Sequence, residues 1–495
     1  MIDRIVRFAR EAERGATLAW VAGSMVALLA ITAFAVDLGW YYLNAARLQR
    51  ASDAAALAGV TWLPTSPANA LQDAETAARV NDFAHATLTG NVLADNKFQV
   101  SMAVDVPTFF ASVVGIETLP LSRTSTAEYI KPIKLGSPSN KFGDGTDSST
   151  AFWASINGPE TAKQQGDPFG TACWSNPYPD TTGVDPPGGC TVSNPEFRSG
   201  GYYYGVEVPA GVSSFNVAVM NGSFYAGGTL LSGTGDYALE ESYYDGNPND
   251  SRWNTTFTLY APDATPTDPY DNSTVVCSRT FGTRYGSNPQ SNDSTYWTDY
   301  NVCSSSASTA THGIGTYVMR VSTSTVSGYS GIGANQYRVR VDSVGGSSRL
   351  FGINDMSIYT NVSGGVSNIY LAEIPTIHAG KKLLINLYDP GEDNGNAYMT
   401  IRPPSGSVSC SYRAYNEAGS QTRSGNSSTC RIQTASSGSS YFQGNWVRIN
   451  IDIPATYSCT TNCWWRIYIE NSQSHDRTTW SAQVIGNPVR LVPNP

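Results

Sequence analysis

Oxygen-bearing side chains, the ligands that calcium prefers, recur in two short runs of this sequence. In the first run they begin at alternate positions, as in a calcium-binding loop: Asp245, Asn247, Asn249 and Asp250. This run departs from the loop pattern, because an aspartate fills the place of the turn glycine and Thr256 stands where a bidentate glutamate should close the shell. Residues 389–394 form the second run. Polar β-turns explain both runs without an ion, so we expect no cofactor and keep calcium as the alternative.

No set of side chains has the spacing of a catalytic site. The chain has only four histidines, and no serine lies in a Gly-x-Ser-x-Gly turn. Ser474, His475 and Asp476 are consecutive, but neighbouring strand residues point to opposite faces and cannot form a relay among themselves. We therefore expect no catalytic residues and no enzyme activity. A secreted hydrolase is the third of three functional alternatives.

The cysteines are even in number and all follow residue 172, which is typical of disulfides formed in an oxidising compartment. They are Cys173, Cys190, Cys277, Cys303, Cys410, Cys430, Cys459 and Cys463. Many connectivities are open, and we favour bridges between consecutive cysteines, which would close loops of roughly 5 to 27 residues. Zinc is the alternative, but the spacings lack two close Cys/His pairs.

Two adjacent tryptophans, Trp464 and Trp465, follow the last cysteine. Exposed aromatic rings in this position could bind a glycan, whereas buried rings would pack on the disulfide. We favour the buried arrangement. Glycan binding is kept for the second functional alternative, a glycan- or calcium-dependent surface adhesin.

Residues 16–36 contain no charged side chain, and they are long enough to cross a membrane. As a helix they would span about 31 Å, close to the hydrocarbon thickness of a bilayer. Arg4, Arg7, Arg10 and Arg14 flank this run on one side only. Positive flanks stay in the cytoplasm, so the sequence predicts residues 1–15 inside, a single span at 16–36, and the remainder outside the cytoplasm of a bacterial cell.

The helix should continue beyond the span, because residues 38–58 are rich in strong helix formers with three- and four-residue apolar spacing. The aromatic run 40–42 suits the outer membrane interface, and Asp37 there is expected to reach headgroups and water. A cleavable signal peptide ending at Ala35 is the rival interpretation. Against it, the apolar run is longer than a typical signal core, and no helix breaker follows.

The composition of the outer part favours extracellular β-structure. Only 14% of the residues are charged, whereas the chain has 46 glycines, 28 tyrosines and 11 tryptophans. Residues 51–495 carry a net charge of −11, since the first 50 hold six of the 31 basic and four of the 40 acidic side chains. This excess of acid excludes nucleic acid as an expected partner.

Residues 37–130 are expected to form a helical stalk and a small α/β unit. Pro67 can open a helix over 67–88, and alternation predicts strands at 98–106 and 119–130. Residues 131–198 are interpreted as a linker and disulfide-containing connector, because their beginning is rich in Gly, Ser, Pro and Asp.

Two related β-sandwiches are predicted over 199–364 and 365–495, which makes the fold class α+β overall. An internal repeat indicates this duplication: Val206-Glu207-Val208-Pro209 resembles Ala372-Glu373-Ile374-Pro375. Later matches keep a near-constant offset, because Arg320 and Arg448, like Arg338 and Arg466, are 128 residues apart in similar strand sequences. An insertion near residues 221–254 is expected in the first copy.

Residues 14–60 carry three motifs of one family: Arg-Gly at 14–15, Ala-Val-Asp-Leu-Gly at 35–39, and Leu-Gln-Arg-Ala-Ser-Asp-Ala-Ala-Ala-Leu-Ala-Gly at 48–59. The segment resembles the N-terminus of TadE/TadG-like tight-adherence (Flp) pilus-assembly proteins. The likeness continues through Phe109-Phe110 to 124–129, about a quarter of the chain.

The resemblance implies a non-enzymatic, single-span envelope protein that contributes to pilus assembly, anchoring or surface attachment, with pilus-assembly or secretion proteins as partners. Prepilin-like members have glutamate where Trp20 stands here, which argues against processing at Gly15. Large members with a von Willebrand A domain carry an Asp-x-Ser-x-Ser metal motif, which this sequence lacks.

Overall fold

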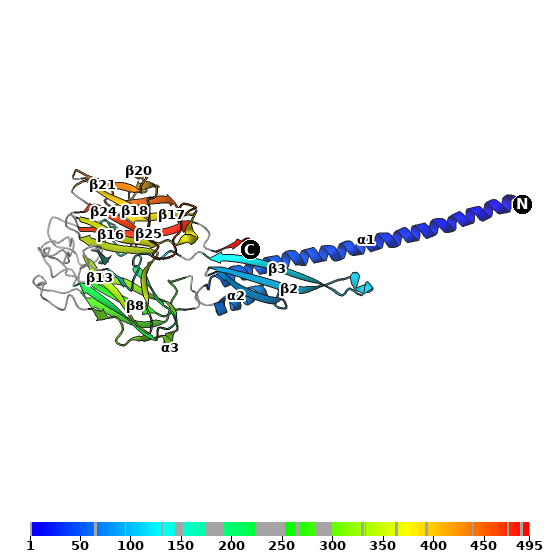
Figure 1. The fold of residues 1–495 in the computed structure, drawn as a ribbon, viewed down its shortest axis with the longest axis horizontal. Helices are drawn as coiled ribbons and strands as arrows, with labels where there is room; N and C mark the ends of the chain where they lie inside the picture. Colours follow the sequence, from blue (N-terminus) through cyan, green and yellow to red (C-terminus); the bar gives the residue numbers. More distant parts are fainter. Residues whose placement is uncertain are drawn as a thin grey trace, which may run out of the picture. The chain divides into compact units, whose positions relative to one another are not determined.

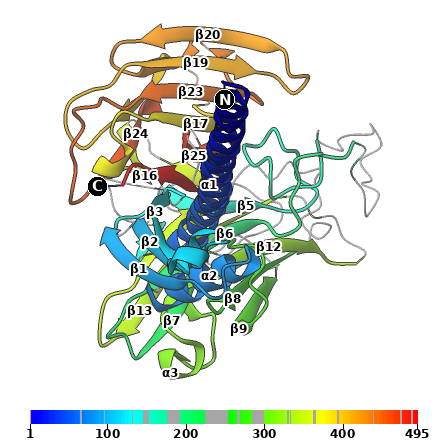
Figure 2. The same ribbon diagram turned by 90° about the vertical axis from the view of Figure 1, so that its right-hand side faces the viewer.

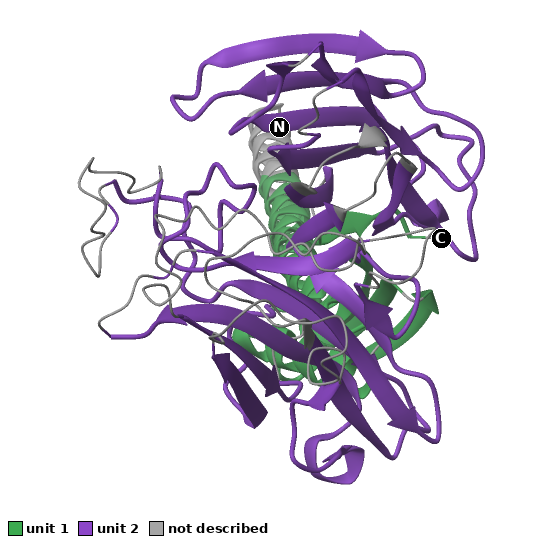
Figure 3. Cartoon of the chain, turned by 90° about the vertical axis from the view of Figure 1, so that its left-hand side faces the viewer, with its two compact units in different colours: residues 1–131, 487–495 green, residues 132–486 purple. Residues whose placement is uncertain are grey.

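The computed structural model divides the chain into two compact units, residues 1–131 with 487–495 and residues 132–486 (Figure 3). It describes residues 2–494 except 64–66, 95, 130–131, 144–151, 175–189, 191, 223–252, 264–267, 283–298, 328–330, 332, 362–364, 392–394, 438, 473–474 and 486–488.

The first unit consists of two helices and a four-stranded antiparallel sheet of order β1-β2-β3-β26. A single continuous helix begins it, as the sequence predicts. The elements are α1 (Ile2–Val60), α2 (Pro67–Val80), β1 (Thr87–Ala94), β2 (Lys97–Pro107), the 3-10 turn η1 (Ala111–Val114), β3 (Thr118–Tyr129) and β26 (Val489–Val492).

The core of this unit forms where the second half of α1 packs on α2 and on the sheet. Leu48, Ala51, Ala55 and Ala56 are completely buried, and their three- and four-residue spacing puts them on one helix face. They pack with Phe98 of β2. Before residue 37 the helix has no such partners, and nearly all its side chains from 18 to 36 are exposed.

Helix α2 ends earlier than the predicted residue 88, and β1 is a strand that the sequence analysis missed. Asp82 has φ +70°, a left-handed conformation that terminates a helix. Phe83 then donates its backbone N–H to Ala78 and is buried. The chain is thereby turned into the sheet at Thr87.

The second unit is built on a twelve-stranded sheet, of which Figure 2 shows the run β20, β19, β23, β17, β25. The path is β10-β7-β13-β5-β15-β25-β17-β23-β19-β20, with β11 pairing β7 and β4 pairing β13. The bounds are β4 (Lys141–Phe142), β5 (Phe152–Asn157), β7 (Ser214–Gly222), β10 (Tyr300–Asn301), β11 (Ala307–Ser308), β13 (Ala334–Val344), β15 (Asp355–Asn361), β17 (Lys382–Tyr388), β19 (Cys410–Tyr415), β20 (Gln421–Ser427), β23 (Trp446–Asp452) and β25 (His475–Ile485).

Two five-stranded sheets complete this unit. One has the order β14-β6-β12-β8-β9, and the other β16-β24-β18-β21-β22. Their strands are β6 (Tyr202–Val208), β8 (Trp253–Tyr260), β9 (Val275–Gly282), β12 (Gly315–Thr325), β14 (Arg349–Ile353), β16 (Gly365–Glu373), β18 (Ala397–Arg402), β21 (Arg431–Ser436), β22 (Ser439–Ser440) and β24 (Trp464–Ser472). Two single turns, α3 (Thr309–His312) and η2 (Thr376–His378), lie between strands.

Each five-stranded sheet packs on one part of the long sheet, which gives two sandwich-like lobes. In the first lobe, the ring centroids of Phe215 in β7 and Tyr317 in β12 lie 4.7 Å apart between the two sheets. In the second lobe, Trp480 of β25 is buried and donates its indole N–H to the carbonyl of Leu371 in β16. One continuous hydrophobic core runs through both lobes, so they are halves of a single unit.

The predicted linker at 131–198 is wrong for the part that the structure describes. Strand β5 lies in the middle of the long sheet, between β13 and β15, and every residue of it is buried. Leu135 and Phe142 are also buried in the common core. The Gly, Ser and Pro residues that are typical of a linker here surround short apolar runs, which are buried in the sheet and its core.

The expected end of the second sandwich at residue 495 is also wrong. Residues 487–495 belong to the first unit, where β26 pairs with β3. Arg490 of β26 forms an ion pair of 2.6 Å with Glu128, which is 7% exposed at its side chain. Such long-range pairing leaves no local signal in a sequence.

The repeat is visible in the strand pairing, but the constant offset derived from the arginines is wrong. Strand β12 lies between β6 and β8, just as β24 lies between β16 and β18, so β12 corresponds to β24. Arg320 is on β12 of a five-stranded sheet, whereas Arg448 is on β23 of the long sheet. Strands of both sheets alternate in the same way, so matching their patterns could not distinguish them.

Four disulfides join consecutive cysteines: Cys173–Cys190, Cys277–Cys303, Cys410–Cys430 and Cys459–Cys463. Two of them cross-link the layers of a lobe. The second bridge runs from β9 of a five-stranded sheet to the segment just after β10 of the long sheet. The third runs from β19 of the long sheet to the residue before β21. Each lobe therefore has its own bridge between its two sheets.

Candidate functional site

Helix α1 is the one helix in the described part of the chain that is long and apolar enough to cross a membrane. Its exposed apolar side chains include Leu18, Met25, Leu28 and Phe34. Exposed leucine and phenylalanine over this length are unfavourable in water and favourable in lipid.

Asp37 ends the apolar segment, and the fold holds its carboxylate. Its Oδ1 accepts the backbone N–H of Phe109 at 2.8 Å, and its Oδ2 accepts that of Ala111 at 2.7 Å. The N–H of Phe110 lies between the two oxygens, at 3.2 and 3.1 Å. The residue is 7% exposed. The expectation that Asp37 reaches headgroups and water is therefore wrong, since three consecutive amides of the β2–β3 connection satisfy it.

The aromatic run after Asp37 also contacts this connection. The Trp40 ring lies 5.4 Å from that of Phe109, edge to face. The Tyr41 hydroxyl lies 3.3 Å from the carbonyl oxygen of Pro120. Tyr42 is exposed. Trp40 and Tyr41 thus contact the β2–β3 connection of the same chain, and Tyr42 remains available for a membrane interface.

Further along α1, polar side chains fix the register of the β2–β3 hairpin. Ser125 of β3 hydrogen-bonds Asp53 and Gln49, and Ser52 donates to the carbonyl of Val100 in β2. These α1 residues belong to the motif at 48–59. Figure 1 shows the hairpin beside α1, with its turn toward the N-terminal half of the helix.

We call the set of hydrogen bonds from the backbone amides of residues 109–111 to the Asp37 carboxylate the clasp.

The predicted metal-binding residues do not form a site among the described residues. Asp245, Asn247, Asn249 and Asp250 lie outside them, as do residues 392–394. Asp389 is described, and its carboxylate accepts the backbone N–H of Gly444 at 2.7 Å, a contact between two segments 55 residues apart in sequence. Within the described part of the chain, no group of three or more His, Cys, Asp or Glu side chains could hold a metal ion.

The other predicted residues are placed as follows. Ser474 lies outside the described residues, and only the backbone of His475 and Asp476 is described, in β25. Trp464 and Trp465 are buried beside the buried Cys463. The alternative in which the exposed rings of these two tryptophans bind a glycan is therefore wrong.

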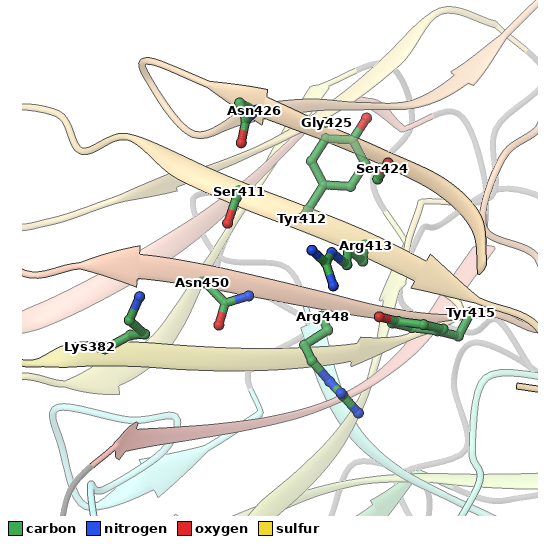
Figure 4. Close-up of a pocket in the computed structure, with 10 residues that line it drawn as sticks. All are labelled: Lys382, Ser411, Tyr412, Arg413, Tyr415, Ser424, Gly425, Asn426, Arg448 and Asn450. Carbon is green, nitrogen blue, oxygen red and sulfur yellow. The ribbon is translucent and has the colours of Figure 1, made fainter. Parts of the chain in front are cut away.

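A cationic cavity of about 500 Å³ lies on the second unit, and the sequence analysis missed it. Strands β17, β19, β20 and β23 carry its lining, and none of the ten residues is acidic (Figure 4). They are Lys382, Ser411, Tyr412, Arg413, Tyr415, Ser424, Gly425, Asn426, Arg448 and Asn450. The sequence carries no signal for it, since these side chains meet only through long-range strand pairing.

Lys163 is the centre of a buried ionic cluster in the same unit. It is 3% exposed, and its Nζ lies 2.6 Å from Glu196 and 3.3 Å from Glu417. Burial raises the pKa of Glu417, opposed by the Tyr388 hydroxyl and by Lys163. Trp446 donates its indole N–H to Glu196. The cluster ties Lys163 and Glu196 to Glu417 and Trp446 of the second lobe, so its arrangement is structural.

A long apolar helix that carries a clasped hairpin and a disulfide-bridged β-unit defines the class: a candidate membrane-anchored protein with a large folded head. Residues 15–70 match the family of putative Flp pilus-assembly TadE/G-like domains, in agreement with the resemblance found in the sequence. This match covers α1 from before its apolar segment to its end, and so includes Asp37.

Other comparisons add no relative. No curated protein matches this chain. The crystal structure of the coconut allergen cocosin has a TM-score of 0.14 and 7% identity over 55% of this chain and 75% of that chain. The structure of the infectious bursal disease virus Gx strain has a TM-score of 0.10 and 10% identity over 59% and 64%. Scores this low carry no argument.

Proposed function

We propose that this chain is a non-enzymatic, single-pass protein of a bacterial cell membrane that contributes to the assembly or anchoring of Flp pili. The observation that supports this best is the clasp, because it joins the end of an apolar helix to a folded unit within the segment matching the pilus-assembly family. A helix with exposed apolar side chains up to Val36 and a hydrogen-bonded carboxylate at Asp37 suits a protein leaving the bilayer at that point.

The proposed orientation has residues 1–15 in the cytoplasm, residues 16–36 in the membrane, and the rest of the first unit and the whole second unit outside the cytoplasm. Four arginines precede the apolar segment, and such positive flanks stay on the cytoplasmic side. All eight cysteines are paired in disulfides in the second unit. Disulfides persist in oxidising compartments, which agrees with that unit lying outside the cytoplasm.

Co-purification from crosslinked membranes tests the proposal. The matched control replaces residues 1–36 with an unrelated single-span anchor and leaves the clasp and the head unchanged. We expect the native chain to recover pilus-assembly or secretion proteins, and the control to recover fewer of them. Absence of every such protein from the native sample would contradict the proposal.

Surface attachment is a second candidate function, supported by the cationic cavity. Arg413 and Arg448 line it with Tyr415, whose ring lies 5.4 Å from the Arg448 guanidinium, a combination suited to an acidic carbohydrate. Binding of a uronate- or sulfate-containing glycan by the purified head should fall in Arg413→Gln. The control is Arg423→Gln, which removes a cation stacked on Tyr441 outside the cavity lining. Equal binding by both variants would exclude the cavity as the site.

A further inference from the structure

The turn between β2 and β3 is an apolar tip. Residues 106–116 read Val-Pro-Thr-Phe-Phe-Ala-Ser-Val-Val-Gly-Ile and contain no charge. Val113 is 85% exposed and Val114 77%, although both are apolar. Phe109, Phe110 and Ile116 are about half exposed. We call residues 109–116 the tip; so much exposed apolar surface on one short turn marks a site that contacts a partner or a lipid phase.

The contacts of the hairpin with α1 show which way the tip points. Ser125 contacts Asp53 and Gln49, Pro120 contacts Tyr41, and the amides of 109–111 bind Asp37. The nearer a hairpin residue lies to the tip, the nearer its α1 partner lies to the N-terminus of that helix. The hairpin therefore runs along the helix by about 24 Å, from residue 53 to residue 37, at 1.5 Å per residue.

The clasp sets the depth of the tip. Asp37 is the first charged residue after the apolar segment of α1. Residues 112–115 follow the amides bound to Asp37, so they lie at or beyond the level where that segment ends at residue 36. Asp105 and Glu117 flank the apolar run and are exposed. Two carboxylates at the base of an uncharged tip limit how deeply it can enter hydrocarbon.

We propose that the tip inserts into the outer leaflet of the bilayer that holds α1, so that the protein contacts its membrane through two elements. This inference rests on the proposed membrane anchoring. The lipid is favoured over a protein partner because the tip continues the exposed apolar surface of α1 at the same level. Tyr42, five residues after Asp37 on α1, keeps its ring exposed, as suits a side chain at a membrane interface.

An introduced cysteine can report on the tip, since all eight native cysteines are in disulfides. Val113→Cys in the full chain is labelled with an environment-sensitive fluorophore and reconstituted in liposomes that contain a doxyl-labelled lipid. Leu28→Cys is the reference within the apolar segment of α1, and Ser122→Cys, exposed on β3, is the reference for water.

We expect the label at position 113 to shift to the blue and to lose roughly half or more of its emission to the doxyl lipid, as a membrane-inserted apolar segment does. The label at 122 should be unaffected. Adding Val114→Glu should return the label at 113 to the signal of 122, without disturbing the fold, because position 114 is exposed.

The references separate failure of this inference from failure of the proposed anchoring. A quenched label at 28 with a water-like label at 113 overturns the tip insertion and leaves the anchor intact. A label at 113 that shifts to the blue without doxyl quenching also overturns it, and indicates a second copy of the chain instead. If the label at 28 is not quenched, both proposals are wrong.

Discussion

Replacing Gly59 of α1 with alanine should destabilise the packing of α1 on α2, whereas Gly39 in the same helix should tolerate alanine. A Cβ built on Gly59 would lie 2.5 Å from the Phe98 ring and 2.6 Å from the carbonyl oxygen of Ala70 in α2. The backbone of α2 cannot move away cheaply, and overpacking of this kind costs about 1–3 kcal/mol. A Cβ on Gly39 meets nothing within 4 Å, so alanine there should gain up to about 1 kcal/mol of helix propensity.

Hydrogen exchange is the appropriate assay, because a chain with two compact units does not unfold in one step. In Gly59→Ala, amide protection in α2 and β2 should fall by about 5- to 150-fold, the equivalent of 1–3 kcal/mol. In Gly39→Ala, protection should be unchanged or higher. Equal protection in the two variants would refute the packing of α1 on α2 and Phe98 that we describe.

Three further variants test other parts of the structure. Replacing Cys410 and Cys430 together with alanine should lower the free energy of unfolding of the second unit by about 3 kcal/mol, measured in urea, and no change would contradict the bridge between its sheets. Lys163→Met should cost roughly 3–5 kcal/mol at pH 7 and less in acid, because burial raises the pKa of Glu417 and its carboxyl is protonated as the pH falls; a pH-independent loss would contradict this reasoning. Asp37→Ala should speed amide exchange at residues 109–111 in detergent, whereas unchanged exchange would show that the clasp is not formed.

The sequence was sufficient for α1 and for many strands, because their signals are local. An uncharged run, followed by three- and four-residue spacing, specifies both the exposed and the buried part of one helix. Alternation likewise located β2 and β3. Strand β1 was missed because the predicted helix ran to residue 88, into the first two residues of the strand, whereas the left-handed conformation of Asp82 ends the helix earlier.

The candidate site was predictable only in part. The composition around residues 35–42 marked the end of the apolar segment, but the partner of Asp37 lies more than 70 residues away in sequence. The common sheet of the two lobes was also hidden, because β5 enters its centre from the supposed linker. Long-range pairing of this kind is decided by burial and register, which a single sequence does not reveal.

Labelling of single cysteines in cells tests the proposed membrane topology most directly. Phe8→Cys lies before the apolar segment, and Ser347→Cys lies on an exposed loop of the second unit. With a membrane-impermeant maleimide on spheroplasts, we predict labelling of position 347 without lysis and of position 8 only after lysis. Labelling of position 8 in intact spheroplasts, or protection of position 347 until lysis, would contradict an anchored head outside the cytoplasm.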